Sequence, residues 1–514
     1  MDRIAFALVV TCVSLVACHV APAVDAGRTR EPPMNVLVIV GDDHATQAFG
    51  AYGAERATTP HLDELARQSV RLSRAYANNP VCTPSRQSML TGLLPHRAGV
   101  TLLESALSES TLSLADHLGA HGYRTAIIGK THFNSASKHG FDLAADTGEY
   151  RKHLKLHPPK AVPPQQKVRG PWRPFKDPPR VWLNADALPE DKFEDDTQSA
   201  FLVNTTLGFI DEAHARKQPF LVWLAFHEPH SPYNFPVEYA GRVDPGQMRV
   251  PDVLPQDFGQ VPLVFKDLSD NDKRGIVAAY HTSVMFMDAM IGRALAGLRA
   301  RGLDKNTLVI YVSDHGYHLG QHGRFEKHSF YENSVRTPFL LRAPGMAHGQ
   351  TNRALVELID LFPTISDYAG VPLPPLMHGL SVRPLVEGHT SALRPFAFST
   401  YQQNEEAMVL TDEWKFVYQR GQVMRSDGYE DSNPTPGRQR ILYNVANDPD
   451  EVHNVAEQNP AVVKQMEDTM VKRFAATWPN DLPVSASASA EDMLDVYVQA
   501  PERLRATESR LRSN

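Results

Sequence analysis

Residues 35–44 read NVLVIVGDDH, an apolar run that ends in two adjacent aspartates and a histidine. Near-continuous runs of Val, Ile and Leu are typical of strands whose two faces are both covered in a parallel sheet. Runs of the same texture recur along the chain, and we predict strands at Asn35–Val40, Arg124–Ile128, Pro219–Phe226, Thr307–Val312 and Pro338–Leu341. The opening run is therefore predicted to be a buried strand with a polar cluster at its carboxyl end.

Amphipathic patterns lie between these runs. They predict helices at His61–Val70, Leu112–Leu118, Ala200–Ala215 and Asp272–Arg301. The first helix follows Thr59-Pro60, which places a hydroxyl N-cap candidate before a proline at the first helical position. Buried strands that alternate with helices predict an α/β fold, in which a large, mostly parallel sheet is sandwiched by helices.

The pattern changes from about residue 375 onwards. Short strands are predicted there, followed by one helix, at Ala407–Thr411, Trp414–Tyr418, Ile441–Tyr443 and Val462–Phe474. We therefore expect a smaller C-terminal α+β domain. The complete expected organisation is a signal peptide over 1–26, a main domain over 32–374 with a proline-rich insertion at 150–195, a small domain over 375–484 and a peripheral tail over 485–514.

The N-terminus resembles a secretory signal. Its apolar run, Ile4–Val16, is shorter than the roughly 20 residues that a transmembrane helix needs, and small residues follow it. Two interpretations remain open. A lipoprotein signal would end before Cys18, which would then carry the lipid, whereas ordinary signal peptidase would cleave after Ala26. We expect an exported protein, either periplasmic or anchored to a membrane through Cys18, with secretion as the alternative.

Composition narrows the classes of function. The 514 residues carry a formal net charge of -7 and contain no basic run, which argues against a nucleic-acid partner. Only three cysteines occur, and Cys12 and Cys18 lie in the leader, so Cys82 has no disulfide partner in the folded body. A lone thiol is usually a small buried hydrophobe. In an exported protein, however, an unpaired cysteine also points to a reactive site.

Polar clusters follow four of the predicted strands. They are Asp42-Asp43-His44, Lys130-Thr131-His132, His227-Glu228-Pro229-His230 and Ser313-Asp314-His315. Open α/β sheets bind their ligands at the carboxyl ends of the strands. Each cluster alone could be a solvated turn or a helix cap. The four together predict one site.

The residue types in these clusters indicate the chemistry of the site. Adjacent aspartates repel each other unless a cation lies between them, and oxygen-rich ligand sets favour Ca²⁺ or Mg²⁺. We expect a metal site formed by Asp42, Asp43, Asp314 and His315. Several cations lie at strand ends or in turns and predict an anion pocket: Arg86, Lys130, His132, His230 and Lys327. A helix that starts near Pro84 would add its N-terminal dipole and favour a reactive thiolate at Cys82.

The segment Cys82-Thr83-Pro84-Ser85-Arg86 resembles the C-x-P-S-R signature of the type I, formylglycine-dependent sulfatases of the alkaline-phosphatase superfamily. Further motifs of that family match in the same order, at Gly129–His132, Pro229–Pro232 and Ser313–Gly316. The segment DHGYHLGQHGRFEK from Asp314 is similar to iduronate-2-sulfatase-like members, whereas FHEPH from Phe226 resembles heparan N-sulfatase.

The resemblance implies a mechanism and assigns roles. A maturation enzyme would oxidise Cys82 to formylglycine, whose hydrated form is the nucleophile and also binds the metal, Ca²⁺ in preference to Mg²⁺. Asp42, Asp43, Asp314 and His315 would be the other metal ligands. Arg86 would hold the hydrated aldehyde. The other implied roles are sulfate binding by Lys130, Lys327 and His230, proton donation to the leaving oxygen by His230 or Lys327, and proton removal by His132.

The expected substrate is a sulfated small molecule or oligosaccharide, such as a glycosaminoglycan-derived sugar. Two alternatives remain. The same machinery serves phosphonate monoester and phosphodiester hydrolases, and a different class of function would be an inactive glycan-binding protein. His227 has no role in the implied mechanism, and we expect a structural histidine there.

Overall fold

The computed structural model describes residues 33–164, 183–346, 349–421, 429, 437–482, 484–485 and 487–513. The predicted signal peptide with Cys18, and the middle of the 150–195 insertion, lie outside the described residues and stay predictions. From Met34 onwards the chain forms one compact unit. Among the helices of the described part, none combines the length and the apolar character needed to cross a membrane.

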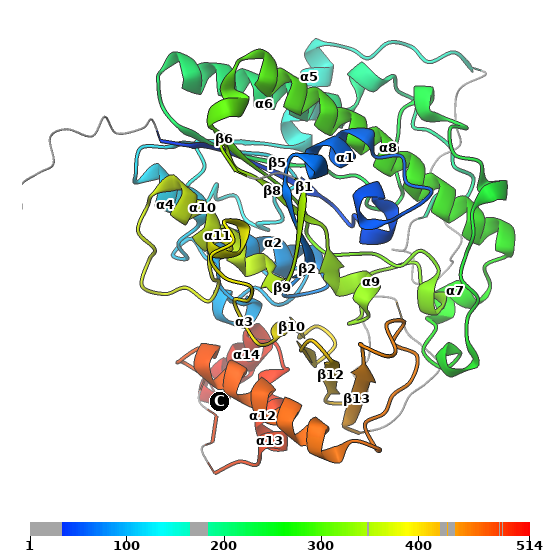
Figure 1. Ribbon diagram of the computed structural model, residues 1–514, viewed down its shortest axis with the longest axis vertical. Coiled ribbons are helices and arrows are strands. Elements are labelled where there is room, and N and C mark those ends of the chain that lie inside the picture. The colour runs from blue at the N-terminus through cyan, green and yellow to red at the C-terminus, as the bar shows by residue number, and fades with distance from the viewer. Residues whose placement is uncertain are drawn as a thin grey trace, which may run out of the picture. The chain divides into compact units, whose positions relative to one another are not determined.

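The main sheet has nine strands (Figure 1). In chain order they are β1 (Asn35–Gly41), β2 (Val70–Tyr76), β3 (Arg124–Gly129), β4 (Leu143–Ala145), β5 (Phe220–Ala225), β6 (Thr307–Ser313), β7 (Arg336–Thr337), β8 (Phe339–Arg342) and β9 (Gln350–Glu357). Their spatial order is β4-β3-β5-β1-β6-β8-β2-β7, and β9 pairs with β2. In this order the strands β4, β3, β5, β1 and β6 are mutually parallel, whereas β8 runs antiparallel to β6. The predicted fold class is confirmed.

Both faces of this sheet are covered. In β1 every residue is buried, and alternate side chains enter different cores, Val36, Val38 and Val40 on one face and Leu37 and Ile39 on the other. One core is completed by α2 (Cys82–Thr91), α4 (Leu114–Gly119) and α10 (Leu361–Ala369). The other is completed by α1 (Pro60–Arg67), α6 (Gln198–Ala215) and α8 (Asp270–Ala300) (Figure 1).

Four strands of the sheet were not predicted, namely β2, β4, the two-residue β7 and β9. The helical pattern expected to reach Val70 ends at Arg67, because Val70 already belongs to β2. β2 contains two arginines, β9 begins with exposed polar residues, and β4 has only three residues. None of them has the continuous apolar run on which the strand predictions rest.

The C-terminal region contains a four-stranded antiparallel sheet of β10 (Ala397–Tyr401), β11 (Glu406–Leu410), β12 (Trp414–Gln419) and β13 (Gln439–Asn444), packed against α12 (Pro460–Thr477). The expectation of a peripheral tail over 485–514 needs correction. Helix α13 (Ala490–Tyr497) buries Leu494 and Tyr497 in the core of this region. In α14 (Pro501–Ser513), Glu502 accepts a hydrogen bond from the Thr101 N–H at 2.8 Å. The boundary near residue 374 stays a prediction.

Candidate functional site

The four polar clusters meet because their strands are neighbours. β3, β5, β1 and β6 lie side by side and run in the same direction. The register aligns the strand ends, since Gly41 pairs with Ser313 and Gly129 pairs with Ala225. Gly129 has φ 104, and a Cβ there would lie 1.8 Å from the Ala225 carbonyl oxygen, so only glycine fits before Lys130. The prediction of one convergent site at this edge therefore agrees with the topology.

Three buried carboxylates occupy the centre of the edge. Asp42 and Asp43 follow β1 and Asp314 follows β6, and each offers an oxygen within 4.8 Å of the others. The Asp43 N–H donates to Asp314 Oδ1 at 3.1 Å, which links the two strand ends. Asp43 has φ 67, a left-handed conformation that costs strain in a residue other than glycine. This strain is the energetic cost of holding two successive carboxylates at one place.

His315 completes this cluster. Its Nδ1 lies 2.9 Å from the Gly316 carbonyl oxygen and donates to it in the neutral ring, which leaves Nε2 as the lone-pair atom. Nε2 lies 3.5 Å from Asp43 Oδ1 and 3.7 Å from Asp314 Oδ1. Burial alone would lower the pKa of His315, but the Asp314 carboxylate outweighs burial and raises the pKa to about 9. The carboxylates therefore demand a positive charge at this point.

The donor atoms fit a divalent cation. Asp43 Oδ2 and His315 Nε2 are buried and have no hydrogen-bond partner among the described residues. Buried polar atoms in native proteins are nearly always satisfied, so unpartnered ligand atoms that face each other indicate a missing partner. Carboxylate oxygens with a single imidazole nitrogen suit a hard or borderline cation rather than a thiophilic one.

Cys82 stands beside the carboxylates as the first residue of α2. It is 3% exposed, and its Sγ lies 3.3 Å from Lys327 Nζ. Burial raises the pKa of the thiol, but Lys130 and Lys327 outweigh burial and hold it well below its usual value. A group at this position is therefore activated as a nucleophile and lies next to the candidate metal ligands.

Arg86 ties the strand ends together from one turn along α2. Its Nε donates to Asp314 Oδ2 at 2.9 Å, and its Nη1 donates to the Lys130 carbonyl oxygen at 3.1 Å. Its Nη2 lies 3.2 Å from Asp42 Oδ1. The guanidinium is 1% exposed, so it acts as a fixed positive charge inside the site.

Two buried lysines provide the remaining strong positive charge. Lys130 Nζ contacts Asp42, and Lys327 Nζ donates to Asp43 Oδ1 at 2.6 Å. Burial lowers the pKa of both ammonium groups, but Asp42 for Lys130 and Asp43 for Lys327 raise the pKa above its usual value. Both lysines are therefore charged and available to bind an anion.

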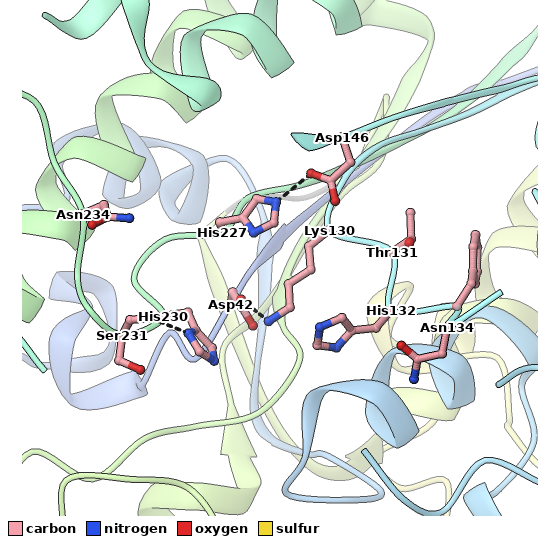
Figure 2. Close-up of a pocket in the computed structure, with 11 residues that line it drawn as sticks. Asp42, Lys130, Thr131, His132, Asn134, Asp146, His227, His230, Ser231 and Asn234 are labelled. Carbon is pink, nitrogen blue, oxygen red and sulfur yellow. Dashed lines mark hydrogen bonds and ion pairs between the residues drawn. The ribbon is translucent and has the colours of Figure 1, made fainter. Parts of the chain in front are cut away.

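His132 and His230 stand at the mouth of the site (Figure 2). His132 Nδ1 lies 3.1 Å from Thr83 Oγ1, and burial together with Lys130 lowers the pKa of its ring. His230 Nδ1 lies 2.7 Å from the Ser231 carbonyl oxygen and Nε2 lies 3.9 Å from Asp43 Oδ2. A neutral imidazole that faces a nucleophile is suited to accept a proton.

A cavity of about 480 Å³ opens above these groups. Its lining joins the predicted residues Asp42, Lys130, His132 and His230 to several that sequence reasoning did not select: Thr131, Phe133, Asn134, Asp146, Ser231 and Asn234. His227, for which we expected a structural role, also lines it. Its Nε2 donates to Asp146 Oδ1 at 2.7 Å (Figure 2). Asp146 directly follows β4, parallel to β3, so the missed signal was a fifth strand end behind a strand of only three residues.

Comparison with known proteins agrees with this geometry. The sulfatase family model matches residues 34–371, and the model for the C-terminal part of N-sulphoglucosamine sulphohydrolase matches residues 320–476. The chain is 28% identical over 410 residues to a choline-sulfatase of Rhizobium meliloti (strain 1021), covering 75% of this chain and 78% of that protein. It is 25% identical over 413 residues to iduronate 2-sulfatase of Mus musculus, covering 70% and 72%.

Solved structures share the fold. A phosphonate monoester hydrolase from Silicibacter pomeroyi superposes with a TM-score of 0.72 at 24% identity, covering 88% of this chain and 98% of that chain. A protein solved with its substrate D-glucosamine-2-N,6-O-disulfate superposes with a TM-score of 0.69 at 22% identity, covering 87% and 99%. At these identities the superpositions establish architecture alone, whereas the family match covers more than half of the 514 residues. The chain therefore belongs to the sulfatase family and is an enzyme that hydrolyses sulfate esters.

Proposed function

We propose that this enzyme removes sulfate from a sulfated carbohydrate through a hydrated formylglycine that a maturation enzyme forms from Cys82. The observation that carries the proposal is the position of Cys82. It begins α2 inside the sequence CTPSR, and it shares one cluster with Asp314 and His315 while Lys327 contacts its sulfur. An unmodified thiol would be trapped as a stable ester, whereas a hydrated aldehyde has a second hydroxyl with which to release sulfate.

The site divides into a metal end and a sulfate end. Asp42, Asp43, Asp314 and His315 would hold the cation, with the modified residue 82 as a further ligand. We propose Ca²⁺, with Mg²⁺ as the alternative, because three of the four protein ligands are carboxylates. When bound, the cation lowers the pKa of a hydroxyl that it contacts and offsets the charge of the carboxylates.

The side chains around residue 82 have separate tasks. Arg86, fixed by Asp314, holds and polarises the modified side chain. Lys130, Lys327 and His230 bind sulfate oxygens, and His230 or Lys327 gives a proton to the alcohol oxygen as its bond to sulfur breaks. His132, kept neutral by its lowered pKa, accepts a proton from the second hydroxyl when sulfate leaves and the aldehyde returns.

The test is sulfate release by the metal-loaded, matured enzyme. We expect the wild-type enzyme to release inorganic sulfate from sulfated monosaccharides, and Cys82→Ala to fall to background because the nucleophile is absent. A matched control is Ser88→Ala, on a buried face of the same helix, which should leave the rate within a few fold. Comparing an aryl sulfate with phenyl phosphonate esters tests the alternative, since a strong preference for the phosphonate would contradict the proposal.

We also propose that the enzyme is exported. The support is the leader sequence, with the apolar run Ile4–Val16 followed either by a lipid-attachment cysteine, Cys18, or by a cleavage site after Ala26. Labelling cells with a radioactive fatty acid distinguishes the two. Label that is lost in Cys18→Ser indicates an anchored lipoprotein, and unlabelled protein that begins at Gly27 indicates soluble export.

A further inference from the structure

The cavity wall has residues that the sulfate chemistry does not use. Besides Asp42, Lys130, His132 and His230, it is lined by polar side chains, namely Thr131, Asn134, Asp146, His227, Ser231 and Asn234. Its only aromatic residue within the described part is Phe133, whose side chain is 3% exposed and therefore offers no open ring face. His230 and Lys130, the proposed sulfate-binding groups, border the same cavity, so the alcohol part of a bound substrate would lie within reach of these side chains.

His227 is held in one orientation on this wall. Asp146 Oδ1 accepts from His227 Nε2 at 2.7 Å (Figure 2) and also from Gln198 Nε2 at 2.9 Å. Burial raises the pKa of Asp146, but the hydrogen bond from His227 has the opposite effect, and the pKa is lowered overall. The carboxylate is therefore charged and keeps the proton of the His227 ring on Nε2. In the neutral ring, Nδ1 is then an acceptor.

Asn134 is also held in one orientation, and like His227 it has an acceptor atom left over. Its Nδ2 donates to the carbonyl oxygens of Leu103 at 2.8 Å and Ser105 at 3.0 Å, so both amide protons are used inside the protein. The remaining polar atom, Oδ1, is an acceptor. Two oriented acceptors that line one cavity match a ligand that brings hydroxyl donors, and they disfavour a second anionic group beside them.

We propose that His227, oriented by Asp146, and Asn134 form the subsite for the alcohol part of the substrate, and that they select a neutral, hydroxyl-rich sugar. This rests on the sulfatase function proposed above and narrows it. A trimethylammonium group would need exposed aromatic faces, and an aryl group would need an apolar slot, and the described wall provides neither. His227 contacts substrate without taking part in sulfur–oxygen cleavage, and Asp146 is a positioning residue.

The experiment compares two substrates in matched variants. The probes are the fastest substrate among N-acetylglucosamine 6-sulfate, N-acetylgalactosamine 4-sulfate and galactose 6-sulfate, together with 4-nitrophenyl sulfate, which has no hydroxyl group. We expect His227→Ala to lower kcat/KM for the sugar sulfate about 5- to 20-fold, mainly by raising KM, with 4-nitrophenyl sulfate changed less than twofold. Asp146→Asn should give a smaller change in the same direction.

Controls separate this result from misfolding and from failure of the parent proposal. His389→Ala removes an exposed histidine whose Nδ1 lies 3.5 Å from Glu387, and it should change neither substrate. An equal loss on both substrates, a fall in kcat alone, or no loss on either would overturn the subsite. A wild-type preference for choline sulfate or 4-nitrophenyl sulfate over every sugar would also overturn it. Absence of sulfate release from all probes would instead defeat the proposed function.

Discussion

Two groups of buried carboxylates in this enzyme differ in how completely their oxygen atoms are hydrogen-bonded. Glu357 and Asp360, at the end of β9, are 1% and 0% exposed, as are Asp43 and Asp314 in the site. In the first group the Phe398 N–H at 2.9 Å and Asn78 Nδ2 at 3.1 Å donate to Glu357, and the Leu380 N–H donates to Asp360 at 2.8 Å. Arg394 bridges the two carboxylates at 3.2 and 2.6 Å.

The site differs because partners are missing within it. Asp43 Oδ2 and His315 Nε2 face the cluster without a hydrogen bond from any described residue. A buried charge that is fully hydrogen-bonded and paired serves the structure, whereas one that lacks partners implies a ligand or a function. The contrast therefore separates a carboxylate pair that stabilises the fold from a cluster whose unpartnered atoms fit a cation.

The largest expected effect comes from neutralising one carboxylate in each group. Asp43→Asn should lower kcat/KM at least about a thousandfold, because it removes a candidate ligand of the cation. In metal-free protein it should cost little stability, because relief of the repulsion among the three clustered carboxylates offsets the weakened contact with Lys327. Glu357→Gln should leave activity of the folded enzyme within a few fold and lower the free energy of unfolding by about 2 kcal/mol, since it weakens charge-assisted hydrogen bonds.

Sulfate-release kinetics and urea unfolding of the two variants, side by side, check this contrast. Equal stability losses, or comparable activity losses, would mean that the two groups do not differ in kind.

Metal removal should have the next largest effect. Chelation is expected to abolish turnover and to lower the free energy of unfolding by about 2.7 kcal/mol relative to protein with cation at a hundred times its Kd. Calcium titration followed by calorimetry measures both the affinity and the stabilisation. The same shift should appear in Glu357→Gln and disappear in Asp43→Asn, and a chelator-insensitive wild type would remove the basis for a cation site.

The smallest effect concerns another buried carboxylate, which forms no ion pair with any residue that the structure describes. Asp288 accepts from the N–H groups of His61 at 3.1 Å and Leu62 at 2.8 Å at the start of α1, and burial raises its pKa to about 7. The folded state therefore keeps a proton that the unfolded state loses near pH 4. Its contribution to stability is complete below about pH 4 and is lost as pH rises to about 7.

Asp288→Asn should abolish this decline, which can reach about 1.4 kcal/mol per pH unit. Urea midpoints measured from pH 4 to pH 8 in the wild type and the variant give the difference. Parallel curves would show that Asp288 titrates normally.

The sequence predicts the strands that are buried on both faces, because such strands consist of continuous apolar residues. The core strands β1, β3, β5 and β6 have continuous apolar runs, and the polar residues after them include the candidate metal ligands as well as Lys130 and His230, which the topology brings to one edge of the sheet. The sequence does not predict the strands whose conformation depends on the strands that they pair with. β2 and β9 are held by each other, β4 is too short to have a pattern, and the Asp146–His227 pair exists only because β4 lies beside β3. Likewise, the polar segment 485–514 hides Leu494, whose burial depends on the neighbouring sheet.

The chemical state of residue 82 decides whether the enzyme uses a formylglycine nucleophile. Trypsin releases the peptide Ala75–Arg86, and its mass in protein from the natural host distinguishes a thiol from an aldehyde. We expect a peptide in which the cysteine sulfur has been replaced by an aldehyde oxygen, and which reacts with a hydrazide. Finding only unmodified cysteine in that protein would contradict this expectation.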